Sequence, residues 1–350
     1  MTPRQRMCEA VRRGHPDRVP KDISFTPHVL QMFKDKTGMD DPAEFFDLEA
    51  RWVELAPLER PPDFSEYLAD LPDGAAVNSD YGTAAIPGGF YHFVRRVFVM
   101  GKFTTAAEVE QYPWPDYRSD YRYARLGQEV NAVHDAGYFA QGFGGHIFET
   151  AWQLTGFEKL LESMVMQPDF AAAVLDHITE NNVVRARRLA QAGVDMVQIA
   201  DDVAMQDRMM MSPGLWREWF KPRHGKVVQA AREVSPDIPI FYHSDGSVEA
   251  VIEDLIDIGV TVLNPVQPEC MDVREIKRKY GDRLAFWGTI GTQTVMPFGT
   301  PEEVRRTVRE MIGLFAPGLV LAPTHVVEPD VPWENILAFR DAVRDYGALG

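Results

Sequence analysis

A histidine and a carboxylate stand two residues apart in the stretch FYHSDGSVEAVIEDLIDIG, which covers residues 241–259. His243 and Asp245 are residue types that bind divalent metal ions or form an acid–base pair. The same residues also permit a structural interpretation. Asp245 could cap the helix that the following apolar stripe predicts, and His243 could be an interior histidine with satisfied hydrogen bonds.

Similar polar residues stand near the ends of other short apolar runs. A rim that gathers so many carboxylates and imidazoles costs stability unless these groups are paired or bind something, so together they predict one site. The candidate residues, besides His243 and Asp245, are Asp201, Asp202 and Gln206 after one run, Asn264 and Gln267 after another, Tyr242 and Trp287 within runs, His146 and Glu149 after a fourth, and Thr324 and His325 after the last.

The runs that must position these residues are short, rich in β-branched or aromatic residues and bounded by Gly, Pro or Asp. They are nearly continuous in apolar residues, as expected for parallel strands covered on both faces. Helix signals separate them, including an N-cap and proline at Ser212-Pro213 and possible capping boxes at Asp272 with Glu275 and Thr300 with Glu303. The seven predicted strands are residues 21–25, 137–143, 194–200, 238–243, 260–265, 283–288 and 318–323.

Alternating strands and helices favour an α/β fold, a (β/α)8 TIM barrel that forms one domain over residues 1–350. We expect a helical N-terminal extension over residues 1–20 and enlarged βα-loops, with a long loop and hairpin insertion over residues 55–120. The weakest element is the eighth strand, for which residues 74–82 are the candidate. An open doubly wound sheet is the alternative, although no Gly-x-Gly-x-x-Gly follows a strand.

Composition narrows the classes of partner. Asp and Glu total 52 against 36 Lys and Arg, so the formal charge is −16, which argues against nucleic acid as a partner. There are 2 cysteines, Cys8 and Cys270, and therefore no disulfide framework. Without an N-terminal signal peptide pattern or a long apolar run, the sequence predicts a cytoplasmic protein that does not enter the membrane. Cys270 is expected to be structural, not a ligand.

Aromatic residues near the predicted mouth of the barrel would suit a flat substrate ring, and they would suit a barrel core equally well. They are Phe143, Phe148, Trp152, Tyr242, Phe286 and Trp287.

Several segments together resemble the uroporphyrinogen decarboxylase superfamily. They are RRGHPDRVP, GVDMVQIADD, SPGLWREWFKPR, HSDGSVEAVIEDLIDIGVTVLNPVQP, YGDRLAFWGTIGTQ and APTHVVEPDVPWENI. The resemblance covers most of the chain and implies a TIM barrel. It also implies one of two activities: decarboxylation of a tetrapyrrole, or methyl transfer with a corrinoid (cobalamin) protein.

The charge of the substrate separates these branches. The decarboxylases of the superfamily hold an octacarboxylate with two arginines just after the first strand, where this chain reads DISFTPHVLQMF. No arginine occurs from Asp22 to Phe33, so this anion clamp is missing, although His325 matches a decarboxylase histidine in position. The sequence therefore favours the methyltransferase branch over a decarboxylase.

In the methyltransferase branch the resemblance implies a zinc site. Its ligands here would be His243, Asp245 in place of the usual thiolate, and His325, which leave one position open. An oxygen-rich site is matched to polarising an ether oxygen. Without metal, His243 or His325 would act as general acid, with Asp245 or Asp202 orienting the imidazole.

The resulting hypothesis is a methyltransferase of the O-demethylase type. It would move a methyl group from an O-methylated small molecule, with methoxy-aromatic compounds among the candidates, to the cobalt of a corrinoid protein. No Asp-x-His-x-x-Gly cobalamin-binding segment occurs in the chain, so a partner protein would carry the cobalamin. The expected catalytic residues are His243, Asp245, Asp202 and His325. Glu149, Asp201, Gln206, Tyr242, Asn264, Gln267 and Trp287 are expected to bind substrate. The alternatives are a decarboxylase of the same superfamily and a non-catalytic binding barrel. The resemblance also makes a homodimer a candidate assembly.

Overall fold

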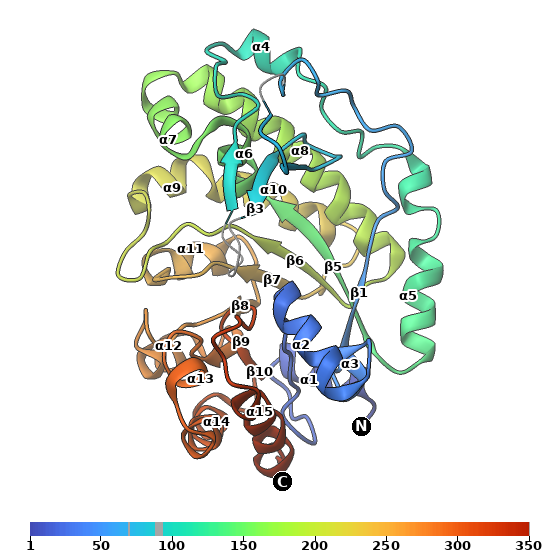
Figure 1. The fold of residues 1–350 in the computed structure, drawn as a ribbon, viewed down its shortest axis with the longest axis vertical. Helices are drawn as coiled ribbons and strands as arrows, with labels where there is room; N and C mark the ends of the chain where they lie inside the picture. The colour runs from blue at the N-terminus through green and yellow to red at the C-terminus, as the bar shows by residue number, and fades with distance from the viewer. Residues whose placement is uncertain (69–70, 88–93, 350) are drawn as a thin grey trace.

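The computed structural model describes residues 1–68, 71–87 and 94–349. Its central feature is a curled parallel sheet of seven strands in the order β1-β5-β6-β7-β8-β9-β10, which helices surround (Figure 1). The strands are β1 (Ala50–Val53), β5 (Phe139–His146), β6 (Met196–Ala200), β7 (Ile240–His243), β8 (Val262–Asn264), β9 (Ala285–Ile290) and β10 (Leu319–Pro323). Six of the seven predicted runs are these strands, β5 to β10, with small shifts at their ends.

The remaining predicted run, residues 21–25, occupies the first position of the barrel. It makes isolated parallel bridges to the last strand and its continuation, at Lys21 with Leu321 and at Phe25 with Val327. Backbone hydrogen bonds from Asp22 to Leu321 and from Leu321 to Pro20 fix its register against β10. With this segment beside β10 and β1 at the other edge, the sheet forms the predicted (β/α)8 TIM barrel.

The prediction of the eighth strand at residues 74–82 is wrong. Within that stretch β2 (Ala76–Val77) pairs antiparallel with β3 (Ala84–Pro87) in a separate small sheet. The barrel strand that the sequence analysis missed is β1, whose ARWV sequence lacks a continuous apolar run. Its Trp52 is 51% exposed, and the Arg51 guanidinium lies over the ring of Tyr138, so β1 does not look like a strand buried on both faces.

Helices alternate with the barrel strands and cover their outer side. Ser212 and Thr300 cap their helices as predicted, and Asp272 accepts the backbone N–H groups of Arg274 and Glu275. The α-helices are α1 (Pro3–Val11), α2 (Pro27–Thr37), α3 (Pro42–Phe45), α4 (Ala106–Glu110), α5 (Leu126–Asp135), α6 (Phe148–Thr155), α7 (Phe157–Met166), α8 (Pro168–Ala192), α9 (Pro213–Trp219), α10 (Lys221–Arg232), α11 (Ile252–Asp257), α12 (Val273–Tyr280), α13 (Val295–Phe298), α14 (Pro301–Phe315) and α15 (Trp333–Tyr346). Two 3-10 helices are η1 (Asp120–Tyr123) and η2 (Glu249–Val251).

Within the described part of the chain, no helix combines the length and apolar character that crossing a lipid bilayer requires.

Helix α1 closes the end of the barrel opposite the carboxyl ends of the strands. Its buried side chains Met7, Ala10 and Val11 form one apolar cluster with residues inside the barrel, among them Phe139 and Trp287. The predicted N-terminal extension is therefore packed against the barrel interior. This packing keeps water away from the amino ends of the strands.

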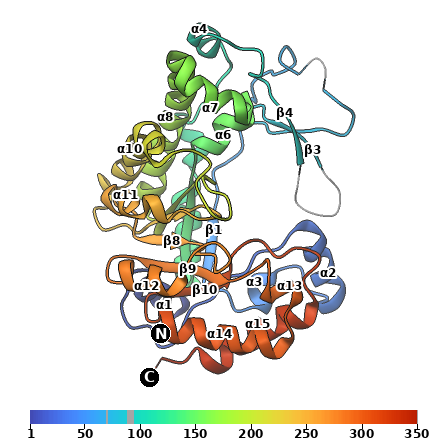
Figure 2. The ribbon, with the colours of Figure 1, turned by 90° about the vertical axis from the view of Figure 1, so that its left-hand side faces the viewer.

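A small antiparallel sheet lies to one side of the barrel, next to α6. It consists of β2, β3 and β4 (Val94–Val97), and Figure 2 shows β3 and β4 projecting beyond the helices. Part of the loop and hairpin insertion that the sequence predicts over residues 55–120 falls on residues 69–70 and 88–93, which lie outside the described residues.

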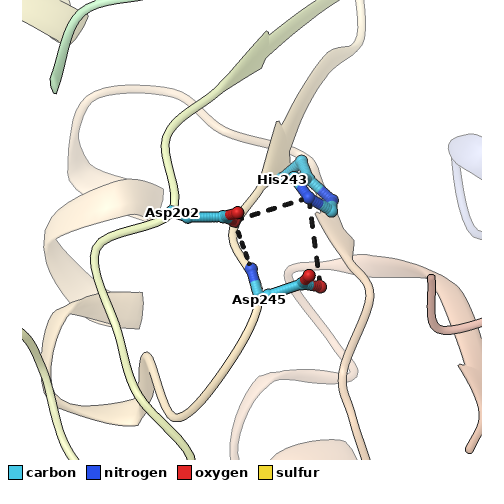
Figure 3. A group of neighbouring side chains, drawn as sticks. All are labelled: Asp202, His243 and Asp245. Carbon is cyan, nitrogen blue, oxygen red and sulfur yellow. Dashed lines mark hydrogen bonds and ion pairs between the residues drawn. The ribbon is translucent and has the colours of Figure 1, made fainter. Parts of the chain in front are cut away.

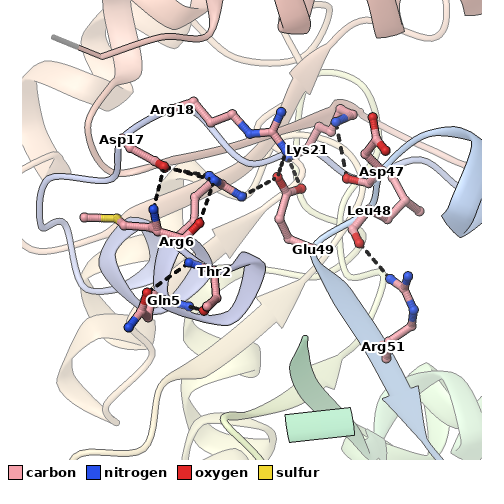
Figure 4. A network of polar contacts seen from close by, with 11 residues as sticks. Thr2, Gln5, Arg6, Asp17, Arg18, Lys21, Asp47, Leu48, Glu49 and Arg51 are labelled. Carbon is pink, nitrogen blue, oxygen red and sulfur yellow. Dashed lines mark hydrogen bonds and ion pairs between the residues drawn. The ribbon is translucent and has the colours of Figure 1, made fainter. Parts of the chain in front are cut away.

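A buried ionic network joins α1, the first barrel segment and β1 (Figure 4). The Glu49 carboxylate is 1% exposed and accepts the backbone N–H of Lys21 at 3.1 Å, which bridges the first barrel segment to β1. Arg18 lies 3.1 Å and Arg6 3.4 Å from the same carboxylate, and Arg6 also forms a two-bond pair with Asp17. Between the first barrel segment and β1, the Glu49 side chain thus makes a connection of the kind that backbone hydrogen bonds make between the other neighbouring strands.

Replacing Glu49 by Gln should lower the free energy of unfolding by about 2 kcal/mol. The amide keeps the shape but removes the charge that compensates two arginines, of which Arg6 retains Asp17. Urea denaturation measures the change. Glu54→Gln, at an exposed position just after β1, is the control and should change stability by less than about 0.5 kcal/mol. Equal stability of Glu49→Gln and wild type would contradict the role given to this carboxylate.

The pair between Asp17 and Arg6 should make stability depend on acid pH. The hydrogen bond from Arg6 holds the pKa of Asp17 well below its ordinary value, although part of the carboxyl is exposed. A carboxyl with a lowered pKa in the folded state stabilises the protein above its unfolded-state pKa, and this contribution is lost as pH falls. Between pH 6 and pH 3, Asp17→Asn should therefore lose less stability than wild type in urea titrations. Parallel curves for the two proteins would refute this.

Candidate active site

Three side chains meet at the carboxyl ends of β6 and β7 (Figure 3). His243 ends β7 and pairs in register with Ala200, the last residue of β6, so Asp202 follows β6 directly beside it. The His243 Nε2 atom lies 3.5 Å from Asp202 Oδ1 and 3.9 Å from Asp245 Oδ1. Donor atoms of all three lie within 4.8 Å of one another, which makes them the one group in the described part of the chain that could hold a metal ion.

The backbone around Asp245 is built to hold its carboxylate at this point. Its own N–H donates to Asp202 Oδ1 at 2.8 Å. The next residue, Gly246, has φ of +83°, and a Cβ there would lie 2.4 Å from the carbonyl oxygen of Met205. Glycine is thus required both for the left-handed conformation and for the close approach of the two loops.

The orientation of the His243 ring is fixed from behind by Asn264, at the end of β8. The Asn264 Nδ2 group donates to the carbonyl of Trp287 at 2.8 Å, so its Oδ1 faces the imidazole. His243 Nδ1 hydrogen-bonds this oxygen and must therefore carry a proton. The Nε2 atom is left to face the two carboxylates, as in the second-shell arrangement of metal-binding histidines.

The cluster requires positive charge. Burial lowers the pKa of His243, but Asp245, Asp202 and the hydrogen bond to Asn264 together raise it above its ordinary value. Burial raises the pKa of Asp202, and the nearby Asp245 raises it further against the opposing effect of His243. Asp245 Oδ1 is buried and has no hydrogen-bond partner. A shared proton or a bound cation would satisfy all three groups.

His325, from the loop after β10, borders this cluster. Its Nε2 atom lies 3.8 Å from Asp245 Oδ2, while Nδ1 lies 3.2 Å from the carbonyl of Val326. The structure therefore brings His325 close to Asp245, another member of the expected ligand set, and places Asp202 nearer than Asp245 to His243 Nε2.

A cavity of about 280 Å³ opens beside the cluster at the carboxyl end of the barrel. Six of the candidate residues named from the sequence line it: His146, His243, Asn264, Trp287, Thr324 and His325. Its aromatic walls are Trp52, Phe143, Phe241 and Trp287. This size and lining suit one small molecule with an apolar ring.

Asp201 and Glu149 lie next to the cavity without lining it. The Asp201 carboxylate is fully buried and accepts the backbone N–H groups of Ile147, Phe148 and Glu149, so it holds the first turn of α6. His224 Nε2 lies 3.0 Å from it. Glu149 in turn lies 3.0 Å from His146 Nε2, and this contact lowers the pKa of Glu149 although burial raises it.

Tyr242, Gln267 and Gln206 also lie outside the cavity lining. Tyr242 is fully buried and packs edge-on against His224, because its neighbours Phe241 and His243 take the inward positions of the strand. Gln267 is buried and accepts the N–H of Gly246 at 2.5 Å, so it shapes the loop that carries Asp245. Gln206 is exposed and accepts a hydrogen bond from Cys270.

The remaining aromatic candidates and Cys270 also lie outside the cavity lining. Phe148 and Phe286 are fully buried in the core, and Trp152 lies beneath the Arg96 guanidinium beside the small sheet. Burial raises the pKa of the Cys270 thiol to about 11, which keeps it protonated and makes it a poor metal ligand.

Sequence reasoning missed several residues of the cavity. Asp22, Trp52 and Gln198 line it. In the sequence, the stretch around Asp22 stands out only for its lack of arginine, and Trp52 belongs to β1, which no continuous apolar run predicts. The signal that could have found Asp22 is its place in the first barrel segment, one residue after Lys21, since alternate strand residues face opposite sides.

Comparison with known proteins shows which proteins this chain is similar to. A methylcobamide:CoM methyltransferase MtaA of Methanosarcina barkeri is 28% identical over 198 residues, 57% of this chain and 56% of its own length. A uroporphyrinogen decarboxylase of Chlorobium limicola is 26% identical over 190 residues, 53% of this chain and 52% of its own length. The chain thus spans about half the length of these curated relatives.

Among solved structures, a methyltransferase from Methanosarcina mazei has the same fold, with a TM-score of 0.68 and 19% identity over 99% of both chains. Residues 99–346 match the family model described as Uroporphyrinogen decarboxylase (URO-D). Because that match spans most of the sequence, the chain belongs to the uroporphyrinogen decarboxylase family.

Proposed function

We propose that this chain is a corrinoid-protein-dependent methyltransferase that takes a methyl group from an O-methylated, methoxy-aromatic small molecule. The observation that carries the proposal is the cluster of Asp202, His243 and Asp245, which adjoins a small cavity with aromatic walls. The similarity to a methylcobamide:CoM methyltransferase supports methyl transfer as the reaction class. The acceptor would be the cobalt of a corrinoid carried by a partner protein.

Decarboxylation of a tetrapyrrole fits the cavity less well. A macrocycle with many carboxylates requires several cationic side chains, and no arginine occurs from Asp22 to Phe33. A cavity of about 280 Å³ also suits a single ring better than a macrocycle. We therefore favour the methyltransferase branch of the family.

The donor set fits zinc. Asp245 Oδ1 is buried without a hydrogen-bond partner, and the tautomer fixed by Asn264 leaves His243 Nε2 free of its own proton. His243 and Asp245 would hold the ion with Asp202 or His325 as a third ligand, which leaves a position open. When bound, zinc would supply Lewis acidity toward the ether oxygen of the donor.

The chain's own residues have defined tasks in this reaction. Trp287, Phe143 and Phe241 would hold the ring of the donor and exclude water from the ether oxygen. The methyl–oxygen bond breaks as the methyl group passes to the corrinoid, and the electron pair stays on the oxygen. In the metal-free form of the site, His243 Nε2 would carry the proton that neutralises this oxygen, with Asp202 and Asp245 orienting the ring.

The reaction can be tested with free cob(I)alamin in place of the corrinoid protein. Wild type should accelerate formation of methylcobalamin from 4-methoxyphenol, followed by absorbance, and His243→Ala should lower the rate at least about 100-fold. His15→Ala, at an exposed position, is the control and should keep the wild-type rate. No methylcobalamin above the uncatalysed background, with this donor or other methoxyarenes, would refute the proposed reaction.

Metal content tests the ligand set separately. Mass spectrometry of the purified protein should find about one zinc per chain in wild type and in His15→Ala, and much less in His243→Ala and Asp245→Ala. Zinc that persists in both site variants would place it elsewhere. A wild type without zinc that still transfers methyl groups would assign His243 to proton transfer alone.

A further inference from the structure

The cavity beside the cluster has an unusual charge pattern. Among the described residues that line it, none is Lys or Arg, whereas Asp22 is one of its walls. Neighbouring cations are directed elsewhere: Lys21 Nζ contacts the carbonyl of Asp47 at 3.3 Å, and Arg185 donates to the carbonyl of Phe143 at 3.0 Å. Arg96, over the Trp152 ring, is not part of the lining. An anionic group beside Asp22, away from the His243 cluster, would have no Lys or Arg of the described lining to pair with.

Asp22 is held in a fixed position within this wall. Its backbone N–H donates to Leu321 at 2.9 Å, which fixes it against β10. Its carboxyl Oδ2 accepts the indole N–H of Trp287 at 3.2 Å. Burial raises the pKa of Asp22, although hydrogen bonds from Ile23 and Trp287 lower it. A carboxyl group accepts a hydrogen bond from a hydroxyl or an amide and, when it is protonated, also donates one.

Trp287 connects Asp22 to the reactive cluster. Its indole bonds Asp22, its carbonyl accepts from Asn264, and Asn264 orients His243. Asp22 and His243 both line the cavity and are positioned through the same tryptophan. A substrate that contacts both would be held at two points whose relative placement is set by Trp287.

We propose that Asp22 is a specificity-determining residue that hydrogen-bonds an uncharged polar group of the methyl donor, and that the cavity rejects donors with an anionic group there. This inference rests on the proposed function, which supplies the methoxy group of the donor. It adds that the donor carries an uncharged polar group at its other end and that the cavity rejects an anionic group at that position. Asp22 acts here through binding, while the chemistry takes place at the cluster.

Equilibrium binding of three matched probes tests this inference, measured by isothermal titration calorimetry without any corrinoid. The probes share a methoxybenzene ring: anisole has no polar group, 4-methoxyphenol has an uncharged hydroxyl, and 4-methoxybenzoate has a carboxylate. Wild type should bind 4-methoxyphenol at least about tenfold more tightly than 4-methoxybenzoate. Equal affinity for these two probes would overturn the charge selectivity.

Two variants assign the selectivity to Asp22. Asp22→Leu should weaken binding of 4-methoxyphenol about tenfold and change anisole binding by less than about threefold, which also reports an intact cavity. Asp22→Asn keeps a polar N–H donor and should stay within about threefold of wild type for both probes. Wild-type affinity of Asp22→Leu for 4-methoxyphenol would overturn the proposal, as would a loss in Asp22→Asn equal to that in Asp22→Leu.

The two proposals fail in different ways. If the probes bind as expected but no methylcobalamin forms, the proposed reaction is wrong and the binding role of Asp22 stands. If methyl transfer occurs but Asp22→Leu binds 4-methoxyphenol like wild type, only the inference on Asp22 is wrong. If none of the probes binds to wild type, both proposals are overturned.

Discussion

Two carboxylates and one imidazole share a small, partly buried space at the carboxyl end of the barrel, and this concentration of charge constrains the rest of the site. The backbone N–H of Asp245 donates to the Asp202 carboxylate, which keeps these two residues side by side. Asn264 hydrogen-bonds the Nδ1 atom of His243 and orients the imidazole toward them. Negative charge held in this way favours a proton or a cation between the groups, and the proposed reaction would use either one at the ether oxygen of the donor.

The scaffold supports this arrangement with other buried polar groups that do not reach the cavity. Asp201 holds the first turn of α6 through three backbone N–H groups and thereby places Glu149 beside His146. At the opposite end of the barrel, Glu49 joins the first segment to β1 while α1 packs against the interior. Both carboxylates are fully buried and paired, so the charge that they bring into the protein is compensated locally.

The cavity of this chain differs from the polycarboxylate-binding site that the name of its family suggests. Its described lining includes aromatic rings, three histidines and Asp22, without Lys or Arg. Such a surface suits a neutral aromatic molecule better than a polycarboxylate. In the function proposed here, the reaction and the choice of substrate would depend on different parts of one site: the cluster at the ends of β6 and β7, and the wall formed by Asp22 and Trp287.

The sequence by itself determined the barrel and the neighbourhood of the site. Continuous apolar runs between helix signals identified six strands and the first barrel segment, because strands covered on both faces leave this pattern. It could not identify β1, since Trp52 is half exposed and Arg51 lies over Tyr138. It could also name polar residues near the strand ends, but not the direction in which each side chain points.

Only the tertiary structure decided which of these residues face one another. Neighbouring residues of a strand point to opposite sides, so His243 enters the cavity while Tyr242 packs against His224 outside it. Asp201 and Asp202 are adjacent in sequence, yet one holds a helix and the other meets His243. Asp22 and Trp287 are 265 residues apart in the sequence, yet their side chains form a hydrogen bond in the wall of the cavity. Local sequence patterns show which residues form strands, whereas contacts between side chains depend on how the strands are arranged around the barrel.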